Sequence, residues 1–193
     1  MEGPIQRGRA KWAASKSGRS SGAAPDISPA PSAAVDCAAD RMPPTMDPWR
    51  DVPVFGVRRA ATQPTPRPSA YALIADGSGR IAAVRTGAGV FLPGGGIEPG
   101  ETPEVAAARE TLEECGLVVR WGSWSARAVQ FVDSKEERTY FEKLCTFVDV
   151  VIVSGNGAGG ATDHELLWLP PETASEMMSH ESHAWAIAVW SRQ

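Results

Sequence analysis

Two long runs of β-branched and aromatic residues restrict the possible folds of this chain more than any other feature. Residues 117–133 (LVVRWGSWSARAVQFVD) and residues 139–153 (TYFEKLCTFVDVVIV) are separated only by the polar segment SKEER. Side chains of these types favour extended strands, and a short polar connection between two strands is typical of an antiparallel hairpin. The sequence therefore predicts a sheet that contains this hairpin.

Shorter segments predict further strands. Residues 52–59 have the pattern of a short strand at a sheet edge, and residues 89–93 and 164–170 that of two brief strands. Residues 69–76 and 80–85 flank a glycine-containing turn, which is the usual signature of a second hairpin.

The tail from Pro170 onward has a helical pattern. It opens at PETASEMM and continues through HESHAWAIAVW, where Trp185, Val189 and the neighbouring alanines suit a face packed on a sheet. The glycine-rich residues 155–162 are expected to form a flexible loop. Strands and helices in this order predict an α+β fold with a mixed β-sheet flanked by helices.

Residues 1–45 differ in composition from the rest of the chain. They consist largely of alanine, serine, glycine and proline, with almost no large apolar side chains. Such a segment cannot bury enough apolar surface to offset the entropy of ordering it. We therefore expect a disordered N-terminal extension, followed by a single domain over residues 46–193. A basic arm that binds nucleic acid is the alternative, and the net charge of −4 argues against it.

Composition also excludes other classes of protein. No apolar run approaches the roughly 18 residues that a membrane span needs. Cys37, Cys115 and Cys145 are widely spaced, which fits neither a disulfide framework nor a thiolate metal site. We expect a cytoplasmic protein without a membrane partner, as a monomer or a homodimer.

A helix is predicted to follow Thr102. Thr102 is a suitable N-cap, and Pro103 suits the first helical position. Gly116 supplies the left-handed residue that commonly ends a helix. Helical spacing places three apolar side chains on one side, which we expect to face the core: Val105, Ala108 and Leu112.

Three glutamates near the end of this helix work against its stability. Glu110, Glu113 and Glu114 are spaced i, i+3 and i+4, so they share one face. Like charges at this spacing destabilise a helix by roughly 0.2–0.5 kcal/mol per pair, and the helix dipole disfavours anions near the C-terminus. A bound cation would reverse both effects, and carboxylate oxygens suit Mg²⁺ or Mn²⁺. The alternative is an acidic face that only contacts solvent.

The glycines before the helix favour the metal interpretation. Gly94, Gly95 and Gly96 carry no side chains, so backbone N–H and C=O groups can closely approach a phosphate or a metal. Three glycines alone are weak evidence, because they also suit a simple turn.

The combined pattern is more specific. It consists of Gly95, Glu101 and residues 109–117 (RETLEECGL). This combination resembles the signature of the Nudix hydrolases, and every charged and glycine position of that signature is present. Thr111 stands where the family usually has an aliphatic residue. The resemblance implies a Nudix-type αβα sandwich with a mixed β-sheet, and a loop–helix–loop that binds divalent metal.

Roles for the motif residues follow from the same resemblance. It implies that Glu110 and Glu114 are the principal Mg²⁺ ligands and that the Gly94 carbonyl adds one contact. Glu113 would be a further ligand or would hold a water on the metal. Arg109 and Glu101 would pair and hold the loop against the helix, and such support fixes the geometry of metal ligands.

The resemblance further implies metal-assisted hydrolysis of a nucleoside diphosphate linked to another group. A carboxylate must accept a proton from the attacking water. Glu113 and Glu114 are the first candidates for this base. Candidates outside the motif are Glu142, Asp133, Glu136 and Asp163.

The substrate depends on residues outside the motif. The compact chain resembles the MutT-like nucleoside triphosphate pyrophosphohydrolases, so a (deoxy)nucleoside triphosphate, including an oxidised one, is the favoured substrate. ADP-ribose, a nucleotide sugar and a dinucleoside polyphosphate remain alternatives, as does a non-catalytic domain that senses nucleotides. Substrate contacts are expected from the glycine loop together with Phe91 and Trp168, although aromatic residues equally suit a core. Three histidines lack the spacing of a zinc site: His164, His180 and His183.

Overall fold

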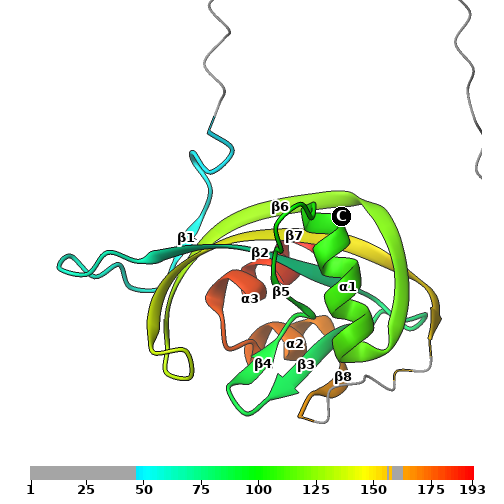
Figure 1. Cartoon of the computed structure of the whole chain (residues 1–193). Helices are drawn as coiled ribbons and strands as arrows, with labels where there is room; N and C mark the ends of the chain where they lie inside the picture. The colour runs from blue at the N-terminus through cyan, green and yellow to red at the C-terminus, as the bar shows by residue number, and fades with distance from the viewer. Residues whose placement is uncertain (1–46, 156, 158–162) are drawn as a thin grey trace, which may run out of the picture. The chain divides into compact units, whose positions relative to one another are not determined.

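The computed structural model describes residues 47–155, 157 and 163–193. The predicted disordered extension over residues 1–45 lies outside the described residues, as does most of the predicted loop over residues 155–162. Within the described part, two β-sheets and three helices form the fold (Figure 1). No helix in this part is long and apolar enough to cross a membrane.

The larger sheet has five strands and is built around the predicted long hairpin. Its strands are β1 (Val54–Phe55), β6 (Leu117–Ser134), β7 (Thr139–Gly155), β2 (Thr65–Ile74) and β5 (Gly94–Gly96), in that spatial order. β6 and β7 pair antiparallel, as expected, and β1 lies at an edge. β2 pairs parallel with β7 and antiparallel with β5. The prediction of a mixed sheet is therefore confirmed.

The smaller sheet corrects one prediction. It contains β4 (Gly89–Phe91), β3 (Ile81–Thr86) and β8 (Glu165–Leu169), with β3 in the middle. The expected hairpin between residues 69–76 and 80–85 was wrong, because β2 and β3 belong to different sheets and meet only at the bridge between Ala75 and Ile81. β2 pairs instead with β7 and β5, whereas β3 pairs with β4, which follows it directly, and with the distant β8.

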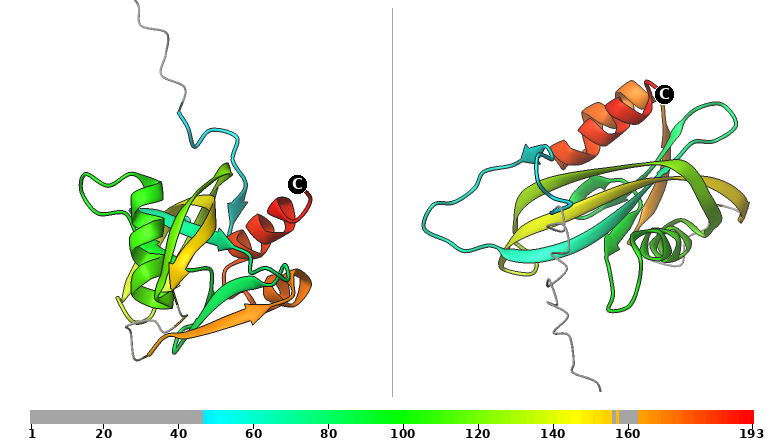
Figure 2. Two further views of the ribbon diagram at one scale, coloured as in Figure 1. Left: turned by 90° about the vertical axis from the view of Figure 1, so that its right-hand side faces the viewer. Right: turned by 90° about the horizontal axis from the view of Figure 1, so that it is seen from above.

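The helices cover both faces of the larger sheet. α1 (Pro103–Cys115) packs on one face, whereas α2 (Pro171–Met177) and α3 (Glu181–Trp190) lie on the other (Figure 2). Two buried apolar clusters follow this division. One joins α1 to alternate residues of β2 and β7, and the other joins α3 to the residues between them. This layering confirms the predicted αβα sandwich.

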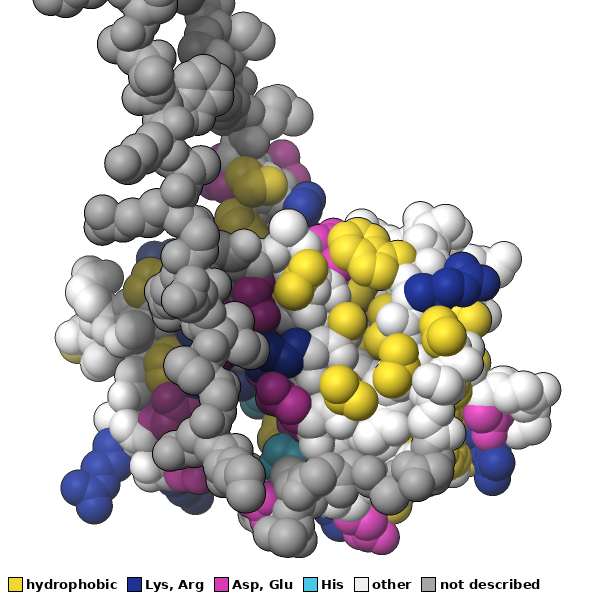
Figure 3. All heavy atoms as spheres, turned by 45° about the vertical axis from the view of Figure 1, so that its right-hand side comes forward, with side chains coloured by type: hydrophobic (Ala, Val, Ile, Leu, Met, Phe, Trp, Pro, Cys, Tyr) yellow, Lys and Arg dark blue, Asp and Glu magenta, His cyan; other side chains and the backbone are white. Residues whose placement is uncertain are grey.

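The buried face of α1 differs from the predicted one. Val105 and Leu112 are each 51% exposed, so they do not face the core. The buried positions are Ala106, Ala107, Thr111 and Cys115. Small side chains bring the helix close to the sheet, while Val105 and Leu112 remain at the surface. Figure 3 shows one face of the molecule on which hydrophobic side chains gather.

Thr111 takes a fully buried position without leaving its hydroxyl unpaired. Its Oγ1 donates a hydrogen bond to the Ala107 carbonyl one turn earlier, at 2.7 Å. A buried polar group costs free energy unless it is hydrogen-bonded. The intrahelical bond therefore explains how threonine replaces an aliphatic residue here.

Candidate functional site

The glycine loop lies against the acidic half of α1. β5 pairs with β2 through the register Ser69–Gly96 and Tyr71–Gly94. Gly94 has φ +144°, and a Cβ there would lie 2.2 Å from the Ala70 carbonyl oxygen. This backbone conformation and close approach require glycine.

Gly95 has a different reason to be glycine. A Cβ at Gly95 would lie 2.6 Å from Oε1 of Glu110 and 2.8 Å from its carboxyl carbon. The missing side chain thus leaves room for the carboxylate of Glu110 directly against the loop. This contact joins the two halves of the sequence motif.

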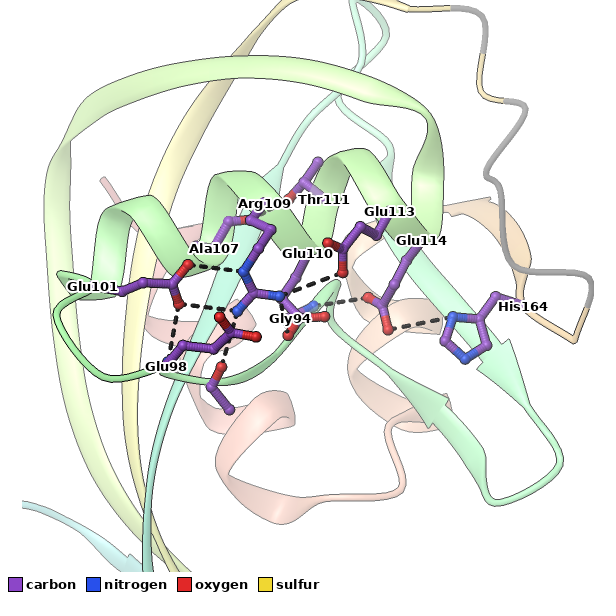
Figure 4. Close-up of polar contacts among 11 residues, drawn as sticks. Gly94, Glu98, Glu101, Ala107, Arg109, Glu110, Thr111, Glu113, Glu114 and His164 are labelled. Carbon is purple, nitrogen blue, oxygen red and sulfur yellow. Dashed lines mark hydrogen bonds and ion pairs between the residues drawn. The ribbon is translucent and has the colours of Figure 1, made fainter.

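Arg109 is the centre of a network that holds the loop against the helix (Figure 4). Its Nε and Nη2 donate to the two carboxylate oxygens of Glu101 at 2.8 and 3.0 Å, and Nη2 also donates to the Gly96 carbonyl at 3.1 Å. The arginine hydrogen bonds hold the pKa of Glu101 down at about 2. The expected pair of Arg109 and Glu101 is therefore present, and both carboxylate oxygens take part.

The three helix acids have distinct surroundings. Glu110 accepts from Nη1 of Arg109 at 2.9 Å. Glu113 is largely exposed and lies 3.4 Å from the same nitrogen. Glu114 is buried more deeply, and its Oε2 accepts from the Gly94 N–H at 2.9 Å. Burial raises the pKa of Glu114 to about 7, and the charges of Glu110 and Glu113 add to this effect.

The donor set fits a hard divalent cation in its chemistry. It offers carboxylate oxygens and backbone carbonyls, which are the ligands that Mg²⁺ and Mn²⁺ prefer. Burial and the neighbouring charges of Glu110 and Glu113 disfavour the ionised form of Glu114, and a bound cation would favour that form. Within the described residues, no three histidine, cysteine, aspartate or glutamate side chains are already gathered as a metal cage. Arg109 and the Gly94 amide hold the carboxylates instead.

A cavity of about 930 Å³ opens beside the glycine loop. Glu114 and all three loop glycines line it, as do Phe91 and three of the candidate bases, Asp133, Glu136 and Asp163. Glu110 and Glu113 do not line this cavity, nor does Glu142. Glu114 is therefore the helix acid shared between the acidic cluster and the cavity.

Trp168 packs against the apolar core and does not line the cavity. It lies on β8 opposite Ala82 of β3, and its half-buried ring packs against the apolar cluster beneath α1. It is not among the residues that line the cavity. Its place in a second sheet explains the difference, because that sheet was not expected from the sequence.

Several polar residues of the cavity wall were not predicted. Nδ1 of His164 lies 3.4 Å from Oε1 of Glu114. Arg67 and Lys143 line the cavity from β2 and β7, and His180 lines it from the segment before α3. None of them belongs to a recognisable motif, and only the parallel pairing of β2 with β7 brings Arg67 beside Lys143.

The start of α3 is tied to the strand that leads into the glycine loop. Nδ1 of the buried His183 accepts from the Leu92 N–H at 3.1 Å. Ser179 forms two bonds with Val90, donating its N–H to the carbonyl at 2.8 Å and accepting the Val90 N–H at 3.0 Å. These bonds fix the position of the chain just before Gly94. No sequence pattern predicts these bonds, because the partners lie far apart along the chain.

Solved structures share this fold. A NUDIX hydrolase from Nitrosomonas europaea aligns with a TM-score of 0.56 at 18% identity, over 66% of this chain and 90% of that chain. A MutT protein from Methanosarcina mazei Go1 gives 0.56 at 20% identity, over 68% and 97%. A C. elegans Ap4A hydrolase gives 0.52 at 16% identity, over 65% and 96%. At these identities the likeness concerns the fold.

The sequence itself carries a family match. No curated protein matches it closely enough to report. The NUDIX domain, however, matches residues 65–189, which include every strand except β1, the glycine loop, α1 and most of α3. This match covers well over half of the chain and confirms the prediction of a Nudix pyrophosphohydrolase at the level of the family. The chain belongs to the NUDIX family.

Proposed function

We propose that this protein hydrolyses a phosphoanhydride bond of a (deoxy)nucleoside triphosphate with Mg²⁺ or Mn²⁺, as a MutT-like member of its family. The observation that supports this most is the position of Glu114. Its carboxylate accepts the Gly94 N–H, faces His164 and lines the large cavity. The acidic cluster and the space for a substrate therefore meet at one side chain.

Glu110, Glu114 and the Gly94 carbonyl would hold the metal, with Glu113 as a further ligand. When bound, a divalent ion supplies charge neutralisation of the diphosphate oxygens and a lowered pKa for the attacking water. Arg109 and its partner Glu101 act as positioning residues, because their hydrogen bonds hold the loop against α1.

A carboxylate must also accept the proton of the attacking water. Glu113 and Glu114 remain the first candidates for this base. Of the candidates outside the motif, Asp133, Glu136 and Asp163 line the cavity that Glu114 also lines. Replacing each by its amide separates these candidates. Loss of the base lowers kcat while metal affinity is retained, whereas loss of a ligand lowers both.

A substrate panel with Mg²⁺ tests the proposal. It contains nucleoside triphosphates, ADP-ribose, a nucleotide sugar and a dinucleoside polyphosphate, scored separately for phosphate and pyrophosphate release. We expect the triphosphates to give the highest kcat/KM, with pyrophosphate as a product and no turnover in excess chelator. Preferred cleavage of another member would reassign the substrate. Tight nucleotide binding without any turnover would instead identify a sensing domain.

A further inference from the structure

Lys143 stands out among the residues of the cavity wall. It lies on β7, in register with Arg67 of β2 and with Gln130 of β6, and its side chain is half-buried where it lines the cavity. Its neighbour across the cavity wall is the segment at the start of α3, which contributes His180. The ammonium group therefore sits in a partly desolvated place.

The neighbouring groups already have other partners. The guanidinium of Arg67 pairs with Glu137 and stacks on Phe141, with its Cζ 4.9 Å from the ring centre. Gln130 accepts the Ser182 N–H at 3.0 Å and donates to the Phe131 carbonyl. The amide of Gln130 is therefore engaged elsewhere, and the positive charge of Arg67 opposes that of Lys143.

The negative charge of Glu137 acts on Lys143, but the Glu137 carboxylate pairs with Arg67. Burial keeps His180 neutral by lowering its pKa to about 3. Among the described residues, Lys143 has neither a hydrogen bond nor an ion pair from its side chain, and burial lowers the pKa of its ammonium group. A desolvated charge costs free energy unless it is paired. An anion in the cavity would supply the missing pair.

We propose that Lys143 binds an oxyanion of the substrate that lies outside the metal-held diphosphate, and that it selects substrates carrying such a group. This inference rests on the proposed function, because it assigns a further contact in the same cavity. The third phosphate of a nucleoside triphosphate supplies this chemistry, and so does the carboxylate of an acidic nucleotide sugar. A neutral nucleotide sugar does not supply it.

Lys135 provides a matched control. It lines the same cavity from the turn between β6 and β7, but its side chain is exposed. Lys135→Met and Lys143→Met remove the same charge from the same cavity. A general electrostatic effect would make the two variants alike, whereas a specific contact affects only the second.

The experiment measures kcat and KM of the full chain with a nucleoside triphosphate, an acidic nucleotide sugar and a neutral nucleotide sugar. For Lys143→Met we expect KM to rise about 30-fold for the nucleoside triphosphate and the acidic nucleotide sugar, equivalent to ~2 kcal/mol. The reason is that one partner of a desolvated charge pair is lost. KM for the nucleotide sugar whose sugar group is uncharged should stay unchanged. Lys135→Met should change every KM by less than about 5-fold, as for an exposed charge. Lys143→Arg keeps the charge, so its KM values should stay close to those of the unmodified protein.

A binding measurement separates this inference from the proposed activity. Calorimetry with Ca²⁺ compares methylene-bridged analogues of a nucleoside triphosphate and a nucleoside diphosphate, and only the former should lose affinity in Lys143→Met. If Lys143→Met does not fold, Lys143→Gln takes its place. An equal change of affinity for the triphosphate and diphosphate analogues, no change at all, or an equal effect of Lys135→Met would overturn the assignment. Absence of all turnover in the unmodified protein would refute the proposed function, while the binding comparison still decides on Lys143.

Discussion

Replacing the three loop glycines by alanine, one at a time, should give three different results. At Gly95 the three atoms nearest to an added Cβ all belong to the carboxylate of Glu110, with the nearest oxygen at 2.6 Å. A flexible side chain can move away, at a cost of about 0.5–1.5 kcal/mol for an unfavourable rotamer. Alanine also restricts the unfolded chain, which returns about 0.4–1 kcal/mol. We therefore expect Gly95→Ala to leave the free energy of unfolding nearly unchanged.

Metal binding should respond quite differently. The displaced carboxylate belongs to Glu110, which we propose as a metal ligand. Metal affinity typically falls about 10–100-fold when a group that orients a ligand is altered. Gly95→Ala should therefore need a correspondingly higher Mg²⁺ concentration for half-maximal turnover.

The two neighbouring glycines serve as controls. A Cβ at Gly96 would lie 3.6 Å from Nε of Arg67, which is ordinary contact, so Gly96→Ala should keep both stability and metal affinity. At Gly94 the Cβ would lie 2.2 Å from the Ala70 carbonyl, and the strained φ alone costs about 1–3 kcal/mol. Gly94→Ala should lose stability measurably.

Urea unfolding and Mn²⁺ titration followed by electron paramagnetic resonance measure the two quantities separately. If Gly95→Ala binds Mn²⁺ like the unmodified protein and turns over normally, Glu110 is not a ligand. If Gly96→Ala weakens Mn²⁺ binding as much as Gly95→Ala does, the loop is sensitive in general and the specific contact with Glu110 is not the cause.

Glu110→Gln and Glu114→Gln should lower metal affinity and turnover far more than the melting temperature, whereas Arg109→Ala should lower all three; wild-type turnover of the Gln variants in limiting Mg²⁺ would contradict the ligand roles. Burial holds the pKa of His183 well below its usual 6.5, so the unfolded chain takes up a proton first as the pH falls. The share of stability that depends on His183 should be complete above about pH 6.5 and then decline by up to ~1.4 kcal/mol per pH unit, while His180 adds to the decline and Glu114, with its pKa raised to about 7, opposes it. His183→Asn, which keeps an acceptor, should flatten this decline in urea midpoints measured from pH 7.5 to 5.5; an unchanged slope would assign it to other groups. Deleting residues 1–45 should leave urea stability and turnover intact, and a truncated chain that is insoluble or inactive would show that this segment is needed.

The local features of the site could be predicted from the sequence because they depend on short-range spacing. Thr102 caps α1 through its side chain, and Gly116 ends the helix with φ +63°, as their residue types suggested. The pairing of Arg109 with Glu101 also follows from the motif. Such features involve residues within about two helical turns of each other.

Features that depend on distant pairing could not be predicted in the same way. Nothing in residues 69–85 shows that β2 will pair with β7 instead of β3, because both alternatives satisfy its hydrophobic pattern. The error over Val105 and Leu112 has a related cause. Helical spacing allowed two faces, and the close packing of α1 on β2 and β5 selected the face with small side chains. The positions of Lys143 and His180 in the cavity wall could not be predicted for the same reason.

The parallel pairing of β2 with β7 has a consequence for the order in which the protein can fold during synthesis. Thr65 pairs with Phe141 and Ile74 with Val150. β2 therefore cannot pair with β7 until the ribosome has synthesised about 76 further residues. At roughly 5–20 residues per second, the ribosome needs several seconds to produce that partner. Long-range pairing of this kind also makes folding slow. We expect the glycine loop and the acidic helix to leave the ribosome before β7 exists to complete the larger sheet, so that nascent chains ending before β7 should remain sensitive to protease.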